Sequence, residues 1–116
     1  MGKVLRYRQG EGKAIAWRDD PTTMITRAVD DSVSDTMGCG YLEMTETKVQ
    51  STIDFDEIIV VLSGHYRTIS GGDTYECGPG DIVWIPANTT FTMETDSEAR
   101  LFYAKYPAKT ATPPTA

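Results

Sequence analysis

Apolar residues along the chain fall into short runs, and glycine, proline and small polar residues separate these runs at the spacing typical of a β-sandwich or barrel. No long window keeps apolar residues at the spacing of a helix face, so we expect little or no helix. The pattern predicts an all-β domain. Its expected strands are Ala14–Trp17, Met24–Ala28, Gly38–Met44, Lys48–Ile53, Glu57–Leu62, His65–Ser70, Thr74–Cys77, Asp81–Ile85, Phe91–Glu94 and Arg100–Tyr106.

Two glycine-rich segments are predicted to form tight turns between strands. Gly71-Gly72-Asp73 contains residues that adopt positive φ angles at little cost, so the strands on either side should pair antiparallel. In Gly78-Pro79-Gly80-Asp81, proline presets φ and glycine is free to enter the left-handed region. These turns explain the glycines of this region without a nucleotide-binding loop.

Alternation of residue types predicts which side of the segment from position 51 to 57 points into the core. Threonine and aspartate occupy the even positions, whereas the odd positions hold Ser51, Ile53, Phe55 and Glu57. Because successive side chains of a strand point to opposite faces, the odd set should face inward, and Asp54 should face solvent. Glu57 is thus a carboxylate on an inward face, which needs a partner or has a raised pKa.

Length and charge restrict the domain organisation and the possible partners. The chain has 116 residues, which fits one domain over residues 1–108 followed by a disordered tail at 109–116. A net charge of -6 argues against nucleic acid or an anionic membrane as partner. The longest apolar stretch, Ile58–Leu62, is too short to cross a membrane, and the N-terminus has no apolar signal core. We expect a cytoplasmic protein in which Cys39 and Cys77 are free thiols.

Two segments have the spacing of paired motifs from a known superfamily. In the first, Glu57 and Gly64 are separated by six residues, and in the second, Gly80-Asp81 and Pro86 enclose Ile82–Ile85. Together the segments resemble the cupins, which are single jelly-roll β-barrels. The resemblance extends from about Gly38 to Pro107 and implies a cupin barrel with a pocket at its mouth or interior.

The resemblance also implies where metal ligands would lie. Cupins that bind a metal use three histidines and a glutamate, and these positions correspond here to Ser51, Ile53, Phe91 and Glu57. Isoleucine and phenylalanine have no lone pair to donate, so we expect no metal and no other cofactor. The single histidine, His65, follows Gly64 at a hairpin and is expected at the surface or rim.

Within the cupins, two further segments are similar to the EutQ family. These are Phe55-Asp56-Glu57-Ile58 and the final run Ala99–Ala108, which ends in Tyr-Pro-Ala. The resemblance implies a link to ethanolamine breakdown in bacterial microcompartments, which adds association with a microcompartment to the expected location. An acetate kinase activity is attributed to the family, but the glycines of residues 71–80 lack the following Lys-Ser/Thr of a phosphate-binding loop.

Three residues are candidates for catalysis. Glu57 is either a general acid or base, or a structural carboxylate bonded to a neighbouring tyrosine or arginine. Tyr103 is either a phenolic donor near Glu57 or a core residue. Glu43 alternates with Leu42 and Met44; if its face points inward, Glu43 and Glu57 form a carboxylate pair able to share a proton.

Six other residues are predicted to line the ligand site, with packing in the core as the alternative for the tryptophan. They are Tyr41, Ser51, Ile53, Trp84, Phe91 and Lys105.

Three functions fit the sequence. The first is a metal-independent, EutQ-like barrel that binds a small organic molecule, as an accessory in ethanolamine or related small amine or alcohol catabolism. The second is a metal-free isomerase, cyclase or lyase that uses Glu57 as its acid–base group. The third is a dimeric interaction module, for which the apolar run Ile58–Leu62 would supply a surface. In every case we expect a homodimer.

Overall fold

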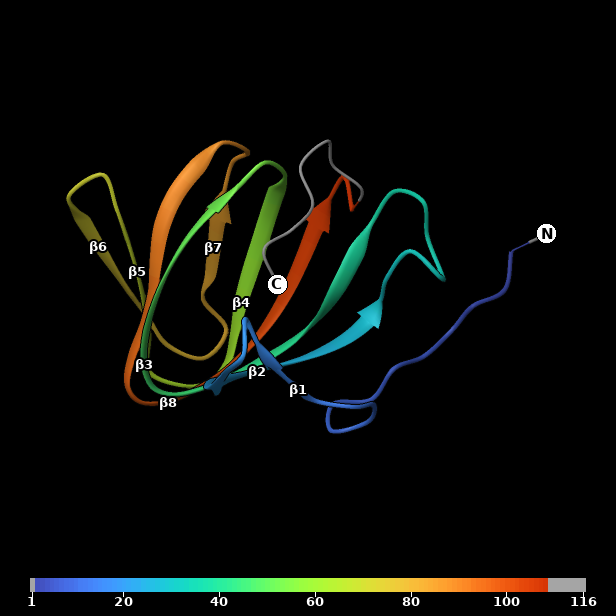
Figure 1. The fold of residues 1–116 in the computed structure, drawn as a ribbon, viewed down its shortest axis with the longest axis horizontal. Coiled ribbons are helices and arrows are strands. Elements are labelled where there is room, and N and C mark those ends of the chain that lie inside the picture. The colour runs from blue at the N-terminus through green and yellow to red at the C-terminus, as the bar shows by residue number, and fades with distance from the viewer. Residues whose placement is uncertain (1, 109–116) are drawn as a thin grey trace.

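The computed structural model describes residues 2–108, and its strands form a single antiparallel sheet that curls into a barrel (Figure 1). No helix occurs in this part of the chain, so the predicted all-β fold is confirmed. The predicted tail at 109–116 lies outside the described residues. The strands are β1 (Ile15–Trp17), β2 (Asp20–Val29), β3 (Gly38–Ile53), β4 (Asp56–Gly64), β5 (Tyr66–Ser70), β6 (Asp73–Cys77), β7 (Ile82–Ile85) and β8 (Thr89–Tyr106).

Strand β8 organises the sheet because it pairs with three other strands. The order of the main path is β1-β2-β3-β8-β4-β7, and β5 pairs with β8 and with β6. The first part of β8 pairs with β5, from Thr92 to Glu94. Its last part pairs with β4, from Ala99 to Tyr106. This change of neighbour along one strand lets the sheet close around an interior.

The two long strands differ from the shorter runs predicted from the sequence. Gly38–Met44 and Lys48–Ile53 are both parts of β3, and Phe91–Glu94 and Arg100–Tyr106 are both parts of β8. The register between the two strands shifts between Thr45 and Thr47, and Glu46 has a φ of 41°. A β-bulge of this kind bends a strand sharply without ending it, which is why polar residues here do not mark a turn.

Both predicted turns are confirmed. Gly71 and Gly72 have φ values of 60° and 85° and join β5 to its antiparallel partner β6. In the second turn, the Gly78 amide donates to the Asp81 carboxylate over 2.8 Å. Gly64 has a φ of 85°, and a Cβ at this position would collide with the Glu98 carbonyl oxygen. The glycine of the first motif is therefore required by close backbone approach as well as by its dihedral angle.

The inner face of the barrel carries the apolar core. Ile59, Val61 and Leu101 are fully buried where β4 pairs with β8. Aromatic residues complete the same cluster, namely Trp17 of β1, Phe55 of the connection between β3 and β4, and Phe91 of β8. Among the described residues, none belongs to a helix long and apolar enough to cross a bilayer.

Candidate ligand-binding site

A cavity of about 350 Å³ lies inside the barrel, lined by residues of β1, β2, β3, β4 and β8. This volume is at the lower end of the range for small-molecule pockets, which starts at roughly 300 Å³. Much of the wall is apolar and consists of Trp17, Ile25, Leu42, Phe55, Phe91 and Met93. The charged side chains in the wall are Arg18, Arg27, Asp54, Glu57 and Lys105.

The pairing of β4 with β8 brings the polar groups of the cavity together. Glu57 of β4 is directly opposite Lys105 of β8, and Ile59 is directly opposite Tyr103. Directly opposite residues of an antiparallel pair project from the same face, with their Cβ atoms roughly 5 Å apart. Glu57, Tyr103 and Lys105 therefore form one polar group at the inner surface of the barrel.

Strand β3 makes space for two of these side chains with glycine. Gly38 is paired with Lys105 and Gly40 with Tyr103. A Cβ at Gly38 would lie 3.0 Å from Cε of Lys105, and one at Gly40 would lie 2.9 Å from the Tyr103 hydroxyl oxygen. The long side chains of β8 thus lie across bare backbone of β3, which positions their polar ends.

Burial in the barrel favours the neutral forms of Glu57, Tyr103 and Lys105. Burial raises the pKa of Glu57 to about 7, against the opposing effect of the nearby Lys105 ammonium. Burial also lowers the pKa of Lys105, although Glu57 acts in the other direction. The pKa of Tyr103 rises to about 12, chiefly through burial. Low polarity disfavours the charged form of each group, so Glu57 exchanges a proton near neutral pH.

Glu57 has no close bonding partner of its own. Within residues 2–108 its carboxylate takes part in no hydrogen bond and in no ion pair within 4.0 Å. The Tyr66 hydroxyl, which Glu57 influences electrostatically, instead accepts a 2.8 Å hydrogen bond from Thr68. The structure therefore does not support the alternative in which Glu57 is a bonded structural anchor.

Arg18 covers one side of the cavity. It lies in the turn between β1 and β2 with a φ of 55°, and its guanidinium stacks 4.1 Å from the centre of the Trp17 ring. The same guanidinium donates to the Ser51 hydroxyl over 2.8 Å and to the Gln50 carbonyl over 2.9 Å. These contacts tie the turn to β3 beside the cavity.

Six of the predicted site residues meet at this cavity. They are Ser51, Ile53, Glu57, Phe91, Tyr103 and Lys105. The inward alternation of residues 51–57 is confirmed, because Ser51, Ile53 and Phe55 are buried and line the cavity together with Glu57. The positions that correspond to cupin metal ligands are thus gathered in one place, but Ile53 and Phe91 offer no ligand atom. These side chains do not fit a metal ion, and no group of three potential ligands occurs among the described residues.

Three predicted placements are wrong. Leu42 and Met44 take the inward positions of β3, so Glu43 is exposed, and its Oε1 lies 3.0 Å from Nη2 of Arg100. No carboxylate pair with Glu57 forms. Tyr41 shares the outer face and packs edge-on against Phe102, with ring centroids 6.1 Å apart. In each strand the face richer in aliphatic side chains is buried, because burial of apolar surface contributes most to folding.

Trp84 is also on the outer face. It is 57% exposed, whereas its neighbour Ile85 points inward and is 3% exposed. Trp84 is paired with Ile58 of β4, which is also exposed. All four residues of β7 are apolar, so alternation along this short strand could not indicate whether Trp84 or Ile85 would face the interior.

Sequence reasoning missed three charged residues of the cavity, namely Arg18, Arg27 and Asp54. Arg27 follows the buried Thr23 and Ile25 at a spacing of two, so alternation along β2 contained the signal. Asp54 lies just beyond the end of β3 and lines the cavity instead of belonging to a fully solvated face. Arg18 enters through the turn geometry, which no sequence pattern indicated. His65 is exposed, as expected.

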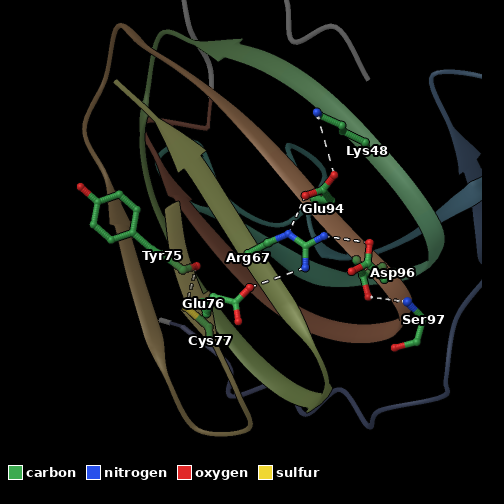
Figure 2. Close-up of polar contacts among 9 residues, drawn as sticks. Lys48, Arg67, Tyr75, Glu76, Cys77, Glu94, Asp96 and Ser97 are labelled. Carbon is green, nitrogen blue, oxygen red and sulfur yellow. Dashed lines mark hydrogen bonds and ion pairs between the residues drawn. The ribbon is translucent and has the colours of Figure 1, made fainter. Parts of the chain in front are cut away.

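A second group of charges lies away from the cavity, on β5, β6 and β8 (Figure 2). Arg67 is at its centre, with Nε 2.5 Å from Glu94, Nη2 2.8 Å from Asp96 and Nη1 3.6 Å from Glu76. The Asp96 and Glu94 carboxylates raise the pKa of Arg67. Each charge of this surface cluster drawn in Figure 2 has a counter-ion within 4.0 Å.

Comparison with known proteins supports both the fold and the family. The family described as ethanolamine utilisation protein EutQ matches residues 9–112. The acetate kinase EutQ of Clostridioides difficile is 33% identical over 72 residues, which cover 62% of this chain and 46% of that protein. The chain thus spans less than half the length of the curated relatives it matches.

Solved structures agree with this assignment. A putative ethanolamine utilisation protein Q of Salmonella typhimurium has a TM-score of 0.71 and 25% identity, covering 75% of this chain and 71% of that one. The cupin domain of Schizosaccharomyces pombe Cnp3 has a TM-score of 0.76, covering 90% of this chain and 75% of that one. Because its identity is only 11%, it supports the fold alone. The barrel, its paired motifs and the matched residues together show that this chain belongs to the EutQ family and has a cupin fold.

Proposed function

We propose that this chain binds a small organic molecule inside its barrel, as an accessory in ethanolamine or related small amine or alcohol catabolism. The observation that carries the binding proposal is the cavity of about 350 Å³, in which polar groups from β4 and β8 face an apolar wall. An apolar pocket with a few convergent polar groups and a group of perturbed pKa is the usual form of a ligand site. The catabolic role rests on the family, whose description names ethanolamine utilisation.

Metal independence is part of this proposal. Its support is the chemistry of Ile53 and Phe91, which stand where metal-binding cupins have histidine. Elemental analysis of the purified protein should find iron, zinc and manganese well below one equivalent. Stoichiometric metal that disappears in Glu57→Gln would contradict the proposal.

Binding is tested with a set of anionic, cationic and neutral small compounds, followed by protein NMR. Compounds that bind in the barrel should shift signals of the wild type but not of Ile53→Trp, because the larger ring occupies the cavity. Val33→Trp adds the same ring at an exposed loop position outside the cavity lining and is the control. A saturating ligand at about a hundredfold its Kd should add about 3 kcal/mol to the free energy of unfolding. Compounds that bind all three proteins equally would place the ligand elsewhere.

The catabolic role is tested by deleting the gene in its own host. Growth on ethanolamine as nitrogen source should slow, whereas growth on ammonium should not change. Complementation with Ile53→Trp should fail if the barrel ligand matters for this role, and complementation with Val33→Trp should succeed.

A second candidate is acid–base catalysis by Glu57. The observation in its favour is a carboxyl with a pKa of about 7 beside Lys105 and Tyr103, where a group can both accept and donate a proton at neutral pH. A bound carbonyl compound with an acidic C–H should then exchange that hydrogen in D2O. Glu57→Gln should slow the exchange by roughly 10²- to 10⁴-fold. Exchange at the wild-type rate in this variant would exclude the role.

We also propose that two copies pair through the outer face of β4 and β7. Exposed by 41–67% are Ile58 of β4, Ile82 and Trp84 of β7, and Tyr106 at the adjoining end of β8. Contiguous exposed apolar side chains mark contact surfaces. Analytical ultracentrifugation should find a dimer for the wild type and a monomer for Trp84→Arg. Tyr75→Arg alters an equally exposed aromatic residue on β6 and should remain dimeric. A wild-type monomer would exclude the interface.

A further inference from the structure

Two cations of the cavity, Arg27 and Lys105, are not held in close ion pairs. Within residues 2–108, neither Arg27 nor Lys105 forms an ion pair within 4.0 Å, and the Lys105 ammonium lies 4.9 Å from the centre of the Phe55 ring. The charge of Arg27 acts on both Tyr103 and Lys105, because it contributes a lowering effect to the pKa of each. Two such cations in a chain of net charge -6 provide a local attraction for an anion.

The register of the sheet places these cations in adjacent rows. Arg27 is paired with Gly40, and Gly40 is in turn paired with Tyr103. Lys105 is two residues farther along β8, opposite Glu57. Because Gly40 has no side chain, nothing on β3 separates the Arg27 guanidinium from the Tyr103 hydroxyl. A carboxylate here would receive hydrogen bonds from one guanidinium, one ammonium and one phenol, which charged acceptors favour.

The apolar part of the cavity wall determines what kind of group the ligand can carry beside its carboxylate. Ile25, Leu42, Phe91 and Met93 line the cavity beyond the polar group and supply no hydrogen-bonding side chain. The cavity of about 350 Å³ is larger than a carboxylate alone requires. An apolar group attached to the carboxylate would bury its surface against these four side chains, whereas a charged group placed against them would find no hydrogen-bonding partner on them.

We propose that the cavity binds a monocarboxylate with an apolar body, and that the ligand enters together with one proton, which Glu57 holds. This inference rests on the proposed function and names its ligand class. The ligand carboxylate contacts Arg27, Lys105 and the Tyr103 hydroxyl. Glu57 faces the same space, so two carboxylates would lie close together if it stayed ionised. Neighbouring carboxylates in a poorly hydrated site share a proton instead of both remaining charged.

The pH dependence follows from the groups that surround Glu57. Those in the cavity or packed against it are Arg18, Arg27, Asp54, Tyr66, Tyr103 and Lys105. The tyrosines, with pKa values raised by burial, stay neutral near pH 7. Glu57, with a pKa of about 7 in the free protein, is the group that changes charge in this range. Binding to its protonated form weakens about tenfold for each pH unit above about 7 and is constant below about 6.

The experiment is titration calorimetry of the full chain with phenylacetate between pH 6 and 9, with 2-phenylacetamide as the neutral analogue. Phenylacetate should bind more tightly than the amide at pH 6 and about a hundredfold more weakly at pH 9 than at pH 6. Titrations at pH 8 in HEPES and in Tris, whose ionisation enthalpies differ, should show uptake of nearly one proton per ligand.

Substitutions separate the two parts of the inference. Glu57→Gln keeps a neutral side chain at every pH, so its affinity for phenylacetate should be independent of pH. Arg27→Met and Lys105→Met should each weaken phenylacetate at least tenfold while changing phenylacetamide little. Arg67→Met removes a cation outside the cavity and is the control, with an expected change below twofold.

The outcomes distinguish this inference from the proposed function. Equal affinity for the acid and the amide, or acid binding that is independent of pH in the wild type, would overturn the inference and leave ligand binding in the barrel intact. No binding of phenylacetate at millimolar concentration would also overturn it, and the wider compound set would then judge the proposed function on its own.

Discussion

Strand β8 carries charged side chains close to its middle, at Glu94 and Asp96, and near its C-terminal end, at Lys105, and the surroundings of the two places differ. Glu94 and Asp96 bond to Arg67 at the surface, where each charge has an oppositely charged neighbour (Figure 2). Lys105 faces Glu57 in the cavity, where burial moves both pKa values toward neutral side chains. One strand thus contributes to two groups of charges. At the surface, Glu94 and Asp96 form ion pairs with Arg67 of β5. In the interior, Lys105 lies opposite Glu57, which can exchange a proton.

The difference has a physical basis in solvation. Water and nearby counter-ions stabilise exposed charges, so the Arg67 cluster can form without a large desolvation cost. In the cavity each charge loses hydration before it meets a partner, and the opposite pair across β4 and β8 regains only part of that loss. An unpaired interior charge therefore lowers stability, and its retention is typical of a functional site.

The largest expected effect is that of Glu57→Gln on stability as a function of pH. A carboxyl with a pKa of about 7 in the folded state and 4.5 in the unfolded state binds its proton more tightly when folded. Its contribution is fully present below pH 4.5 and is lost as pH rises to about 7, a change of about 3 kcal/mol. Urea unfolding at several pH values should show this loss in the wild type and not in Glu57→Gln. An identical loss in both proteins would assign it to another group.

Removing the centre of the surface cluster should have the next largest effect. Arg67→Met leaves Glu94 and Asp96 without their shared cation, so the thermal midpoint at pH 7 should fall by a few degrees. High salt screens exposed ion pairs and should reduce the difference from wild type. The pH dependence assigned to Glu57 should persist in this variant. If it vanished, the two clusters would not be independent.

A smaller effect is expected from Gly38→Ala, which disturbs the cavity group without altering any charge. The added Cβ would lie 3.0 Å from Cε of Lys105, and the flexible side chain should move away from Glu57. Because the Lys105 ammonium lowers the pKa of Glu57, that pKa should rise by a fraction of a unit. Carbon-detected NMR of the Glu57 carboxyl group can follow the titration. A pKa that falls would contradict the placement of Lys105.

The smallest effect is expected from Glu43→Gln, the carboxyl on the outer face of β3. Its exposed pair with Arg100 should contribute less than about 1 kcal/mol. The stability curve against pH should therefore match that of the wild type between pH 4.5 and 7. A curve resembling that of Glu57→Gln would mean that Glu43 belongs to the interior after all.

The sequence by itself determined the all-β fold, both turns and the inward set at residues 51–57. Those features depend on local rules, namely the period of two in a strand and the dihedral freedom of glycine. Alternation also identified Glu57, and the superfamily spacing indicated that Ser51, Ile53 and Phe91 would lie near it.

Tertiary structure alone decided which face of β3 and β7 became the interior, and so excluded Glu43, Tyr41 and Trp84 from the cavity. It also decided that Arg27 would approach Tyr103 and Lys105 across the bare backbone of Gly40. These outcomes depend on register and closure between strands distant in the sequence, whereas local patterns reach only a few residues. The charge and shape of the cavity follow from that pairing.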